Sequence, residues 1–211
     1  MPPPSTAGRP DTRHRLVEAG RRLFHDKGYA ATGLSEVLSL ADANSGSFYH
    51  FFESKDALLR TVLETYVDLL ESHVVGPALA KSDDPLERIF ALLDRYRALV
   101  IASGCQYGCP IGRLALEVDP ENTPAHDLIA RNFDAWKAAV EACLRARGVA
   151  RTGDVATFVL TVMEGAVMQA RAYRSVDPFD ACIRQLRAYL ERLPRVTPTR
   201  RVHKKQRRKG R

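Results

Sequence analysis

Residues 28–59, GYAATGLSEVLSLADANSGSFYHFFESKDALL, carry the pattern that decides the fold. Apolar residues recur there at i, i+3, i+4 and i+7, which predicts a short helix over residues 34–41. A short link follows, and Asn44 then offers a side-chain oxygen that can cap a second helix. Two short helices joined in this way have the dimensions of a helix-turn-helix, whose second helix enters the major groove of DNA. A plain helical hairpin with no DNA partner is the alternative.

The second of these helices, NSGSFYHFF over residues 44–52, mixes two kinds of side chain. Phe48 and Phe52 are i, i+4 neighbours, so we expect both on the face that is turned to the core. Tyr49 and His50 fall on the other side and should face outward. Small residues in the first turn leave backbone N–H groups unpaired, which suits a DNA phosphate. These small residues are Ser45, Gly46 and Ser47.

Nearly all of the remaining sequence has helical periodicity, and no segment shows the alternation of a strand. We therefore predict an all-α protein with a three-helix N-terminal unit, which includes the helix-turn-helix, and a larger helical body. The expected divisions are a flexible arm (1–11), the helix-turn-helix domain (12–54), the helical body (55–194) and a basic disordered tail (195–211). Further helices are expected over 12–27, from after Ser54 to about Val74, and over 86–102, 110–117, 124–147, 153–173 and 178–193, with a break at 76–85.

The 211-residue chain is 45% hydrophobic and 27% charged, a balance typical of a globular protein. Its apolar runs are too short to span a bilayer and its N-terminus lacks a secretory signal, so we expect a cytoplasmic protein with no membrane partner. The net charge is +7, and subtracting the nine Lys and Arg of residues 195–211 leaves −2 for the rest. The tail is either a solubilising end or a mobile arm that neutralises phosphates.

Residues 28–59 resemble, position by position, the DNA-binding region of the TetR family of bacterial transcriptional regulators. The shared pattern is Gly-aromatic, a small residue with Thr, a short helix, a turn, Gly-Ser-aromatic-Tyr-His and a final SKxxLL. EGAVMQARAY (164–173) resembles the dimerisation helix of the family more loosely, and GCPIGRLALE (108–117) resembles a core segment of some members. The resemblance implies a homodimer that binds a palindromic operator in double-stranded DNA, most often as a repressor, and is released by a small-molecule effector.

By position, the resemblance also assigns the DNA contacts. Lys55 is the expected phosphate contact, and Ser47 or Tyr49 is the expected base contact. Thr32 and Lys55 occupy helix N-termini that hold the DNA backbone in the family. The full predicted set is Thr32, Asn44, Ser45, Gly46, Ser47, Tyr49, His50 and Lys55.

Three positions depart from the family pattern. The turn has Asp42 where Gly is common, and Asp tolerates the left-handed conformation less well than Gly. Ser45 stands where Lys is common, and Phe51 stands where His is common. Residues 1–52 hold six Lys and Arg against five Asp and Glu, so we expect this part to be only weakly basic. Either the tail or the arm around Arg9 and Arg13 supplies additional positive charge, or the affinity for DNA falls steeply with salt.

The body suggests both a dimer and an effector pocket. Residues 153–173 and 178–193 have wider apolar faces than one neighbour covers, which predicts four-helix packing across a two-fold axis. Aromatic and Met side chains predict an apolar pocket, and Glu164 is a candidate contact because a buried carboxylate needs a partner. The predicted ligand-binding set is Tyr96, Tyr107, Cys109, Phe133, Trp136, Met163, Glu164 and Met168, with Phe158 as a further candidate.

Cys105 and Cys109 stand in SGCQYGCPIG (103–112), a glycine-rich link that Pro110 turns into a helix. A thiol at a helix N-terminus can have a lowered pKa. Cys109 is therefore either a reactive thiolate that senses oxidants or electrophiles, with Cys105 as the second redox candidate, or a small side chain in a tight link. The cysteines do not predict a disulfide scaffold or a zinc site, so we predict no metal and no cofactor.

Two other functions compete with DNA-binding regulation. One is a thiol-dependent enzyme that uses Cys109 with His126 or His73. The chain contains no GxSxG, HExxH, Walker A or GxGxxG motif, so we predict that it is not an enzyme. The other is a non-specific DNA binder led by the basic tail, which would bind random and operator duplexes equally and would lose binding when residues 195–211 are removed.

Overall fold

The computed structural model describes residues 11–195, and these residues form ten α-helices and one π-helical turn. Within this range there is no strand, only an isolated bridge between Val149 and Arg195. The predicted all-α class is confirmed. No helix in this range is both long and apolar enough to cross a membrane. The predicted arm (1–11) and basic tail (195–211) lie outside the described residues, except for Asp11 and Arg195.

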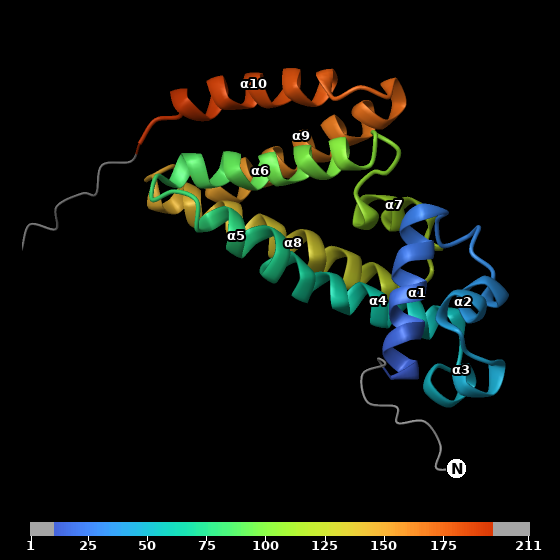
Figure 1. Ribbon diagram of the computed structural model, residues 1–211. Coiled ribbons are helices and arrows are strands. Elements are labelled where there is room, and N and C mark those ends of the chain that lie inside the picture. The colour runs from blue at the N-terminus through green and yellow to red at the C-terminus, as the bar shows by residue number, and fades with distance from the viewer. Residues whose placement is uncertain (1–10, 196–211) are drawn as a thin grey trace, which may run out of the picture.

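The first three helices form a small unit, the head, at one end of the molecule (Figure 1). Side-chain caps mark the helix starts: the Asp11 carboxylate accepts the N–H of His14 at 2.6 Å, and Glu36 accepts the N–H of Gly33 at 3.0 Å. Such caps satisfy backbone donors that have no partner inside the helix. The sequence predicted all three helices to within one residue. They are α1 (Thr12–Asp26), α2 (Leu34–Ala41) and α3 (Ser45–Phe51).

A long helical segment connects the head to the rest of the chain, the body. The predicted helix after Ser54 was expected to reach about Val74, but its α-helical part ends at Leu70. The expected break over residues 76–85 is wrong for its first half, because a further short helix begins there. Pro77 stands in the first turn of that helix, where a residue without an N–H is tolerated. The segment consists of α4 (Lys55–Leu70), the π-helical turn (Glu71–Val75) and α5 (Gly76–Leu79).

Five more helices complete the body, each within one residue of its predicted bounds. α10 lies along α6 and α9 at the side of the molecule away from the head (Figure 1). Two ion pairs fasten it to α6, since Arg97 meets Asp180 at 2.6 Å and Arg187 meets Glu87 at 2.6 Å. These helices are α6 (Pro85–Ala102), α7 (Pro110–Glu117), α8 (Thr123–Ala146), α9 (Thr152–Tyr173) and α10 (Asp177–Arg192).

The buried side chains form two clusters that do not follow the order of the chain. One cluster joins the head to α4, α7 and the first half of α8, and it includes Phe48, Leu58, Leu114 and Ile129. The other cluster fills the body between α6, α8, α9 and α10. α7 therefore packs with the head, although it follows α6 in the sequence. A shared core crosses the predicted boundary between the two domains.

Candidate functional site

The turn between α2 and α3 is held by one residue in the left-handed region and by one arginine. Asp42 has φ +46° and ψ +58°, a conformation that Asp tolerates better than most residues. The side chain of Arg15 on α1 donates to the carbonyls of Ala41 at 2.9 Å and Asp42 at 3.2 Å. These bonds fix the end of α2 relative to α3. Sequence reasoning missed Arg15, because its partners are far away in the chain and no local pattern marks them.

The first turn of α3 is small and open. The side-chain oxygen of Asn44 accepts the N–H of Ser47 at 2.8 Å, so Asn44 caps the helix as predicted. Ser45 and Gly46 are exposed, and Ser47 is half-buried. Small exposed side chains let another backbone approach the free N–H groups of this turn. A phosphate or base contact at these four residues stays a prediction.

The two faces of α3 are divided as the sequence predicted. Phe48 is fully buried, and its ring centre lies 5.7 Å from that of Phe52. Tyr49 is 59% exposed, and His50 is exposed beside it. Phe51 is also exposed and packs edge-on against the His50 ring, with the ring centres 4.7 Å apart. The outward face of α3 therefore carries three rings, whereas the inward face anchors the helix.

Thr32 and Lys55 make hydrogen bonds inside the head, and a DNA contact at either residue stays a prediction. Thr32 is 2% exposed, and its hydroxyl donates to the carbonyl of Gly28 at 2.7 Å. The Lys55 ammonium donates to the carbonyls of Tyr29 and Thr32, both at 2.9 Å, and lies over the Tyr29 ring. An ammonium has three N–H donors, so at most one is left for a phosphate. Both residues position the link between α1 and α2.

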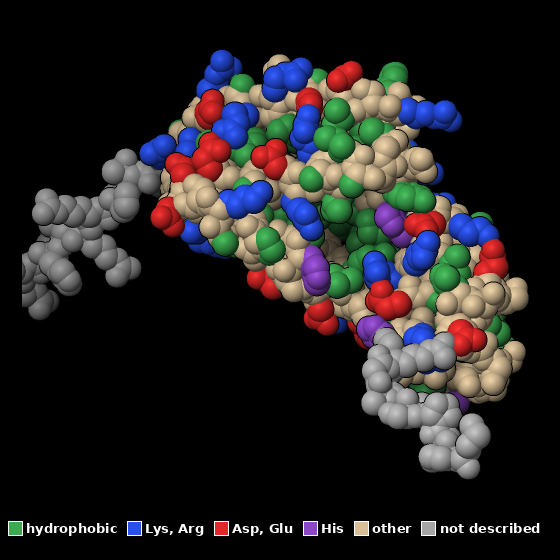
Figure 2. Space-filling model, in the orientation of Figure 1, with side chains coloured by type: hydrophobic (Ala, Val, Ile, Leu, Met, Phe, Trp, Pro, Cys, Tyr) green, Lys and Arg blue, Asp and Glu red, His purple; other side chains and the backbone are tan. Residues whose placement is uncertain are grey.

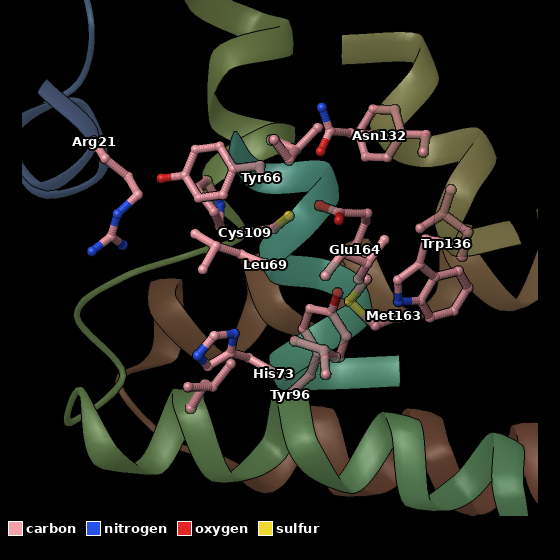
Figure 3. A pocket seen from close by; sticks show the side chains of 17 residues that line it. Arg21, Tyr66, Leu69, His73, Tyr96, Cys109, Asn132, Trp136, Met163 and Glu164 are labelled. Atoms are coloured by element: carbon pink, nitrogen blue, oxygen red, sulfur yellow. The ribbon is translucent and has the colours of Figure 1, made fainter. Parts of the chain in front are cut away.

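A cavity of about 380 Å³ lies where the head meets the body. Figure 2 shows the surface hollowed at this place, with hydrophobic side chains in the hollow, and Figure 3 shows the lining. The lining comes from α4, the π-helical turn, α6, α7, α8 and α9, and α1 adds one arginine. Most of it is aromatic or aliphatic. Six residues of the predicted ligand-binding set line this cavity: Tyr96, Cys109, Phe133, Trp136, Met163 and Glu164.

Three other candidates for ligand binding do not line this cavity, and a ligand contact at them stays a prediction. The Tyr107 ring packs against His25, with ring centres 5.1 Å apart. Phe158 packs against Tyr189 and is 45% exposed, and Met168 is 64% exposed. Phe158 and Met168 are each five positions from the cavity residue Met163, and a helix turns by about 140° over five residues. The same helical period that places Met163 inside therefore directs these two outward.

Four polar residues of the lining were missed from the sequence. Asn132 is the most informative, since it is 4% exposed and its amide N–H groups donate to the carbonyls of Leu63 at 3.0 Å and Leu128 at 2.9 Å. Its amide oxygen is left pointing into the cavity (Figure 3). Apolar periodicity gives no signal for such residues, because they interrupt it. The four are Arg21, Tyr66, His73 and Asn132.

Glu164 projects from α9 into the cavity, towards the sulfur of Cys109 (Figure 3). Its carboxyl group lies beside the Cys109 thiol, and the oxygen Oε1 is buried without a hydrogen-bond partner. Gly112 on α7 makes room for the group, because any side chain there would collide with Oε2. Desolvation raises the pKa of Glu164 above its usual value. The cavity therefore holds a carboxyl group that the protein leaves incompletely paired.

Of the two alternatives for Cys109, its surroundings favour the small side chain in a tight link over the reactive thiolate. Desolvation and the adjacent Glu164 carboxyl raise the pKa of the Cys109 thiol well above its usual value. The backbone N–H groups of Gly112 and Ile111 at the start of α7 act in the opposite direction but do not prevail. Cys105, the second redox candidate, is buried beside another pocket and does not line this cavity. Thiol sensing at Cys109 thus lacks the charged nucleophile on which the hypothesis depended.

The alternative of a thiol-dependent enzyme is not favoured either. Within residues 11–195 no hydrogen bond joins Cys109 to a histidine. His126 is exposed and pairs with the carbonyl of Asp119 at 3.2 Å. His73 lines the cavity, but its Nδ1 pairs with the hydroxyl of Ser72 at 2.7 Å. The same part of the chain contains no group of three or more His, Cys, Asp or Glu side chains that could hold a metal ion.

Arg113 on α7 binds the C-terminal end of α1. Its guanidinium donates to three consecutive carbonyls there, and it pairs with Glu117 at 2.6 Å. The last carbonyls of a helix lack partners within the helix, so the body supplies a cap for a helix of the head. The carbonyls are those of His25 at 3.1 Å, Asp26 at 3.3 Å and Lys27 at 2.6 Å.

Comparison with known protein families gives two matches along the chain. Residues 16–62 match the family described as "Bacterial regulatory proteins, tetR family". Residues 85–185 match "Transcriptional regulator LmrA/YxaF-like, C-terminal domain". The first match covers the head and the start of α4, and the second runs from α6 into α10.

Individual proteins agree with these matches. The chain is 31% identical to an uncharacterized HTH-type transcriptional regulator of Mycobacterium tuberculosis, over 84% of this chain and 93% of the relative. It is 27% identical to the HTH-type transcriptional repressor DhaR of a Mycobacterium species, over 82% of this chain and 88% of the repressor. A crystal structure of a TetR transcriptional regulator from Chloroflexus aurantiacus superposes with a TM-score of 0.75 at 26% identity, covering 88% of this chain and 97% of that one.

Proposed function

The chain belongs to the TetR family and is a DNA-binding transcriptional regulator, and from this premise we propose that it is a cytoplasmic homodimeric repressor released from a palindromic operator by an effector in the cavity. The observation that carries the proposal is the position of α7. The first turn of α7 lines the cavity with Cys109, Pro110 and Ile111, and its next turn holds the end of α1 through Arg113.

The head supplies the DNA contact in this proposal. Its short α3 is anchored by Phe48, and Tyr49 and His50 extend from the opposite face. The second helix of a helix-turn-helix presents such side chains to base edges in the major groove. The small first turn from Ser45 to Ser47 can approach the backbone. Tyr49 and His50 are thus our proposed base-reading residues, and the turn is our proposed phosphate contact.

The last two helices supply the dimer contact. α9 and α10 expose large apolar side chains, among them Phe158, Met168, Tyr173 and Tyr189. Gly165 on α9 has open space above it, so a partner helix could approach closely there. Pairing α9 and α10 of two chains gives a four-helix bundle with two-fold symmetry. Two heads related by that axis would enter successive major grooves about 34–36 Å apart, or a multiple of it, on a palindromic operator.

Effector binding would act on the heads through α7. A molecule in the cavity meets the first turn of α7, and any shift of α7 moves Arg113 relative to the carbonyls that it binds on α1. α1 in turn carries Arg15, which holds the turn before α3. A chain of contacts therefore links the cavity to α3. Packed helices of this kind switch between discrete arrangements, so a small shift can separate or misalign the two heads.

Footprinting on the DNA that flanks the gene of this protein tests the proposal. We expect the dimer to protect a palindrome there. The Tyr49→Ala variant should remain folded and dimeric but lose the protection, because Tyr49 is exposed and packs only at its edge. Equal binding of the operator and of random DNA by the native protein would refute sequence-specific regulation.

A further inference from the structure

The effector cavity is apolar except for a few polar atoms, and these atoms limit the chemistry of what can bind. Two acceptors face the interior, the carboxyl group of Glu164 and the amide oxygen of Asn132. The Oε1 atom of Glu164 has no hydrogen-bond partner, and the N–H groups of Asn132 are already used by backbone carbonyls. A bound molecule is therefore met by unpaired acceptors, which favour a donor.

The basic side chains of the lining do not neutralise Glu164. They are Arg21 and His73, and Figure 3 places Arg21 at the edge of the cavity. The Arg21 guanidinium is paired with Glu18 at 2.6 Å, within α1. His73 is bonded to its neighbour Ser72 on the π-helical turn. Within the described residues, no cation of the lining forms an ion pair with Glu164, and its Oε1 has no hydrogen-bond partner.

Aromatic rings surround this carboxyl group. Tyr66, Tyr96, Phe133 and Trp136 belong to the same lining, and the Tyr96 and Trp136 rings are packed edge to face with their centres 6.3 Å apart. The face of an aromatic ring carries partial negative charge and attracts an ammonium group. The indole N–H of Trp136 is also buried without a partner, but it is neutral and does not oppose a cation. Aromatic rings together with a carboxyl group that no cation neutralises favour the binding of a positively charged ligand.

The facing helix α7 leaves space for the carboxyl group of Glu164. Gly112 on α7 has no side chain, and any Cβ there would collide with Oε2 of Glu164. The carboxyl group therefore touches the first turns of α7 directly. A cation that draws this group towards itself acts on the helix that carries Arg113.

On the basis of the proposed effector function, we infer that the effector is an organic cation, an apolar molecule with one protonated amine that binds against Glu164 and Asn132 among the aromatic rings. The amine provides N–H donors for Oε1 of Glu164 and for the amide oxygen of Asn132. Its apolar part fills the space between the aromatic side chains and Met163. An opposite charge beside Glu164 offsets part of the desolvation cost of its ionised form.

Matched ligands of one shape test this inference. We would titrate the full-length protein with phenylpropylamine, phenylbutylamine and phenylhexylamine by calorimetry, and repeat each titration with the alcohol and the carboxylic acid of the same skeleton. The expected result is that at least one amine binds about 30-fold or more tightly than its alcohol, because a buried charge pair is lost. The inference is overturned if no amine binds, if the alcohol binds equally well, or if the acid binds most tightly.

Two variants locate the effect at Glu164. Glu164→Gln keeps the shape and can still accept from the Cys109 thiol, so it should remain folded and lose the preference for the amine. Glu191→Gln removes one carboxylate from the exposed face of α10 and should keep the full preference. Folding of Glu164→Gln is checked by its circular dichroism spectrum and a cooperative melt. If the folded variant still prefers the amine to the alcohol, the inference is overturned.

The same ligands, added to the protein on its operator, separate this inference from the proposed function. Release of the operator by the alcohol or the acid, without binding of the amine, supports effector control and refutes the organic cation. Tight amine binding that depends on Glu164 but leaves the operator bound supports the cation site and refutes the proposed effector control.

Discussion

The helix α3 takes its cap and its ring packing from neighbours in the chain, whereas the cavity collects side chains from α1 to α9. Asn44 caps α3 three residues on, and Phe48 packs on Phe52 four residues on. The cavity, in contrast, brings Tyr66 on α4 and Trp136 on α8 beside Glu164 on α9. The two faces of α3 are therefore set locally, and the cavity is a product of the whole fold.

This contrast predicts which substitutions alter DNA binding and which alter ligand binding. A change inside the head should act on its stability or on DNA binding and leave the cavity chemistry alone. A change at the cavity should alter ligand binding, and only the contacts of α7 with α1 should transmit the effect. Arg113 is the side chain that lies on that route. Four predictions, in order of decreasing effect, test whether the two regions respond separately.

Phe48→Ala should give the largest loss of stability. The side chain is fully buried in the cluster that joins the head to α4 and α7, and removal of such a ring lowers the free energy of unfolding by about 3–5 kcal/mol. Tyr49→Ala is the matched control beside it, and should change stability by less than about 0.5 kcal/mol. Urea unfolding measures both. Equal losses would mean that the outward face of α3 is also part of the core.

Gly28→Ala should lower the free energy of unfolding by about 2 kcal/mol, because Gly28 has φ +97° and a side chain is strained there. The new methyl carbon would also lie 2.5 Å from the Glu117 carboxylate, which pairs with Arg113. Gly33→Ala is the control: its nearest neighbour would be 3.6 Å away, and we expect a change of less than about 0.5 kcal/mol. If both variants melt alike, the contact between α7 and the end of α1 is looser than the structure shows.

Arg113→Met should uncouple the two regions. The variant loses the hydrogen bonds to the end of α1, which are partly exposed, so we expect a loss of about 1–2 kcal/mol in the free energy of unfolding. Operator affinity should then respond to a bound cavity ligand several-fold less than in the native protein. Arg145→Met, on the exposed side of α8, should leave both properties unchanged. Operator titrations with and without phenylbutylamine provide the measurement, and an unchanged response in Arg113→Met would place the coupling elsewhere.

Glu164→Gln should give the smallest effect, and it should depend on pH. The folded-state pKa of Glu164 is raised by desolvation, so the ionised carboxylate is penalised in the folded protein. The contribution of Glu164 to the free energy of unfolding is fully present below the pKa of the unfolded state. It is lost as the pH rises through the pKa of the folded state. The uncharged variant avoids that loss, while Cys109, the neighbour that faces the carboxyl group, stays neutral.

Thermal melts without ligand at pH 5 and pH 8 measure this difference. We expect Glu164→Gln to melt about 2–4 °C above the native protein at pH 8, the equivalent of ~1 kcal/mol in a chain of this size, and by less at pH 5. A melting temperature that falls at pH 8 would show that Glu164 has a compensating cation in the empty protein.

Local patterns predicted the helices and the two faces of α3 because the relevant interactions are short-range. Helical periodicity sets which of Phe48 and Tyr49 is buried, and the Asn44 cap depends on a donor three residues away. Local patterns gave no signal for long-range contacts made by the same side chains. Lys55 stands at a helix start that suits a phosphate, yet carbonyls more than 20 residues earlier take two of its donors.

The cavity was predicted only in part for the same reason. Periodicity on α9 could select Met163 and Glu164, but it could not tell that Phe158 and Met168 lie on the other side without knowing which face the neighbours cover. Arg21 and Asn132 gave no signal at all, since a polar residue on an amphipathic helix is ordinarily exposed. Their position in the lining follows from the packing of α1 and α8 against other helices.

The sequence by itself determined the helices, the turn before α3 and the side chains that α3 presents, because caps and helical period act over a few residues. The tertiary structure alone decided in which direction the pKa values of the cavity groups move. Cys109 begins a helix, a position that lowers a thiol pKa in isolation, but the packing of α9 places Glu164 beside it and excludes water. Desolvation and the field of a neighbouring carboxyl group depend on which helices meet, and helices that meet here are far apart in the chain.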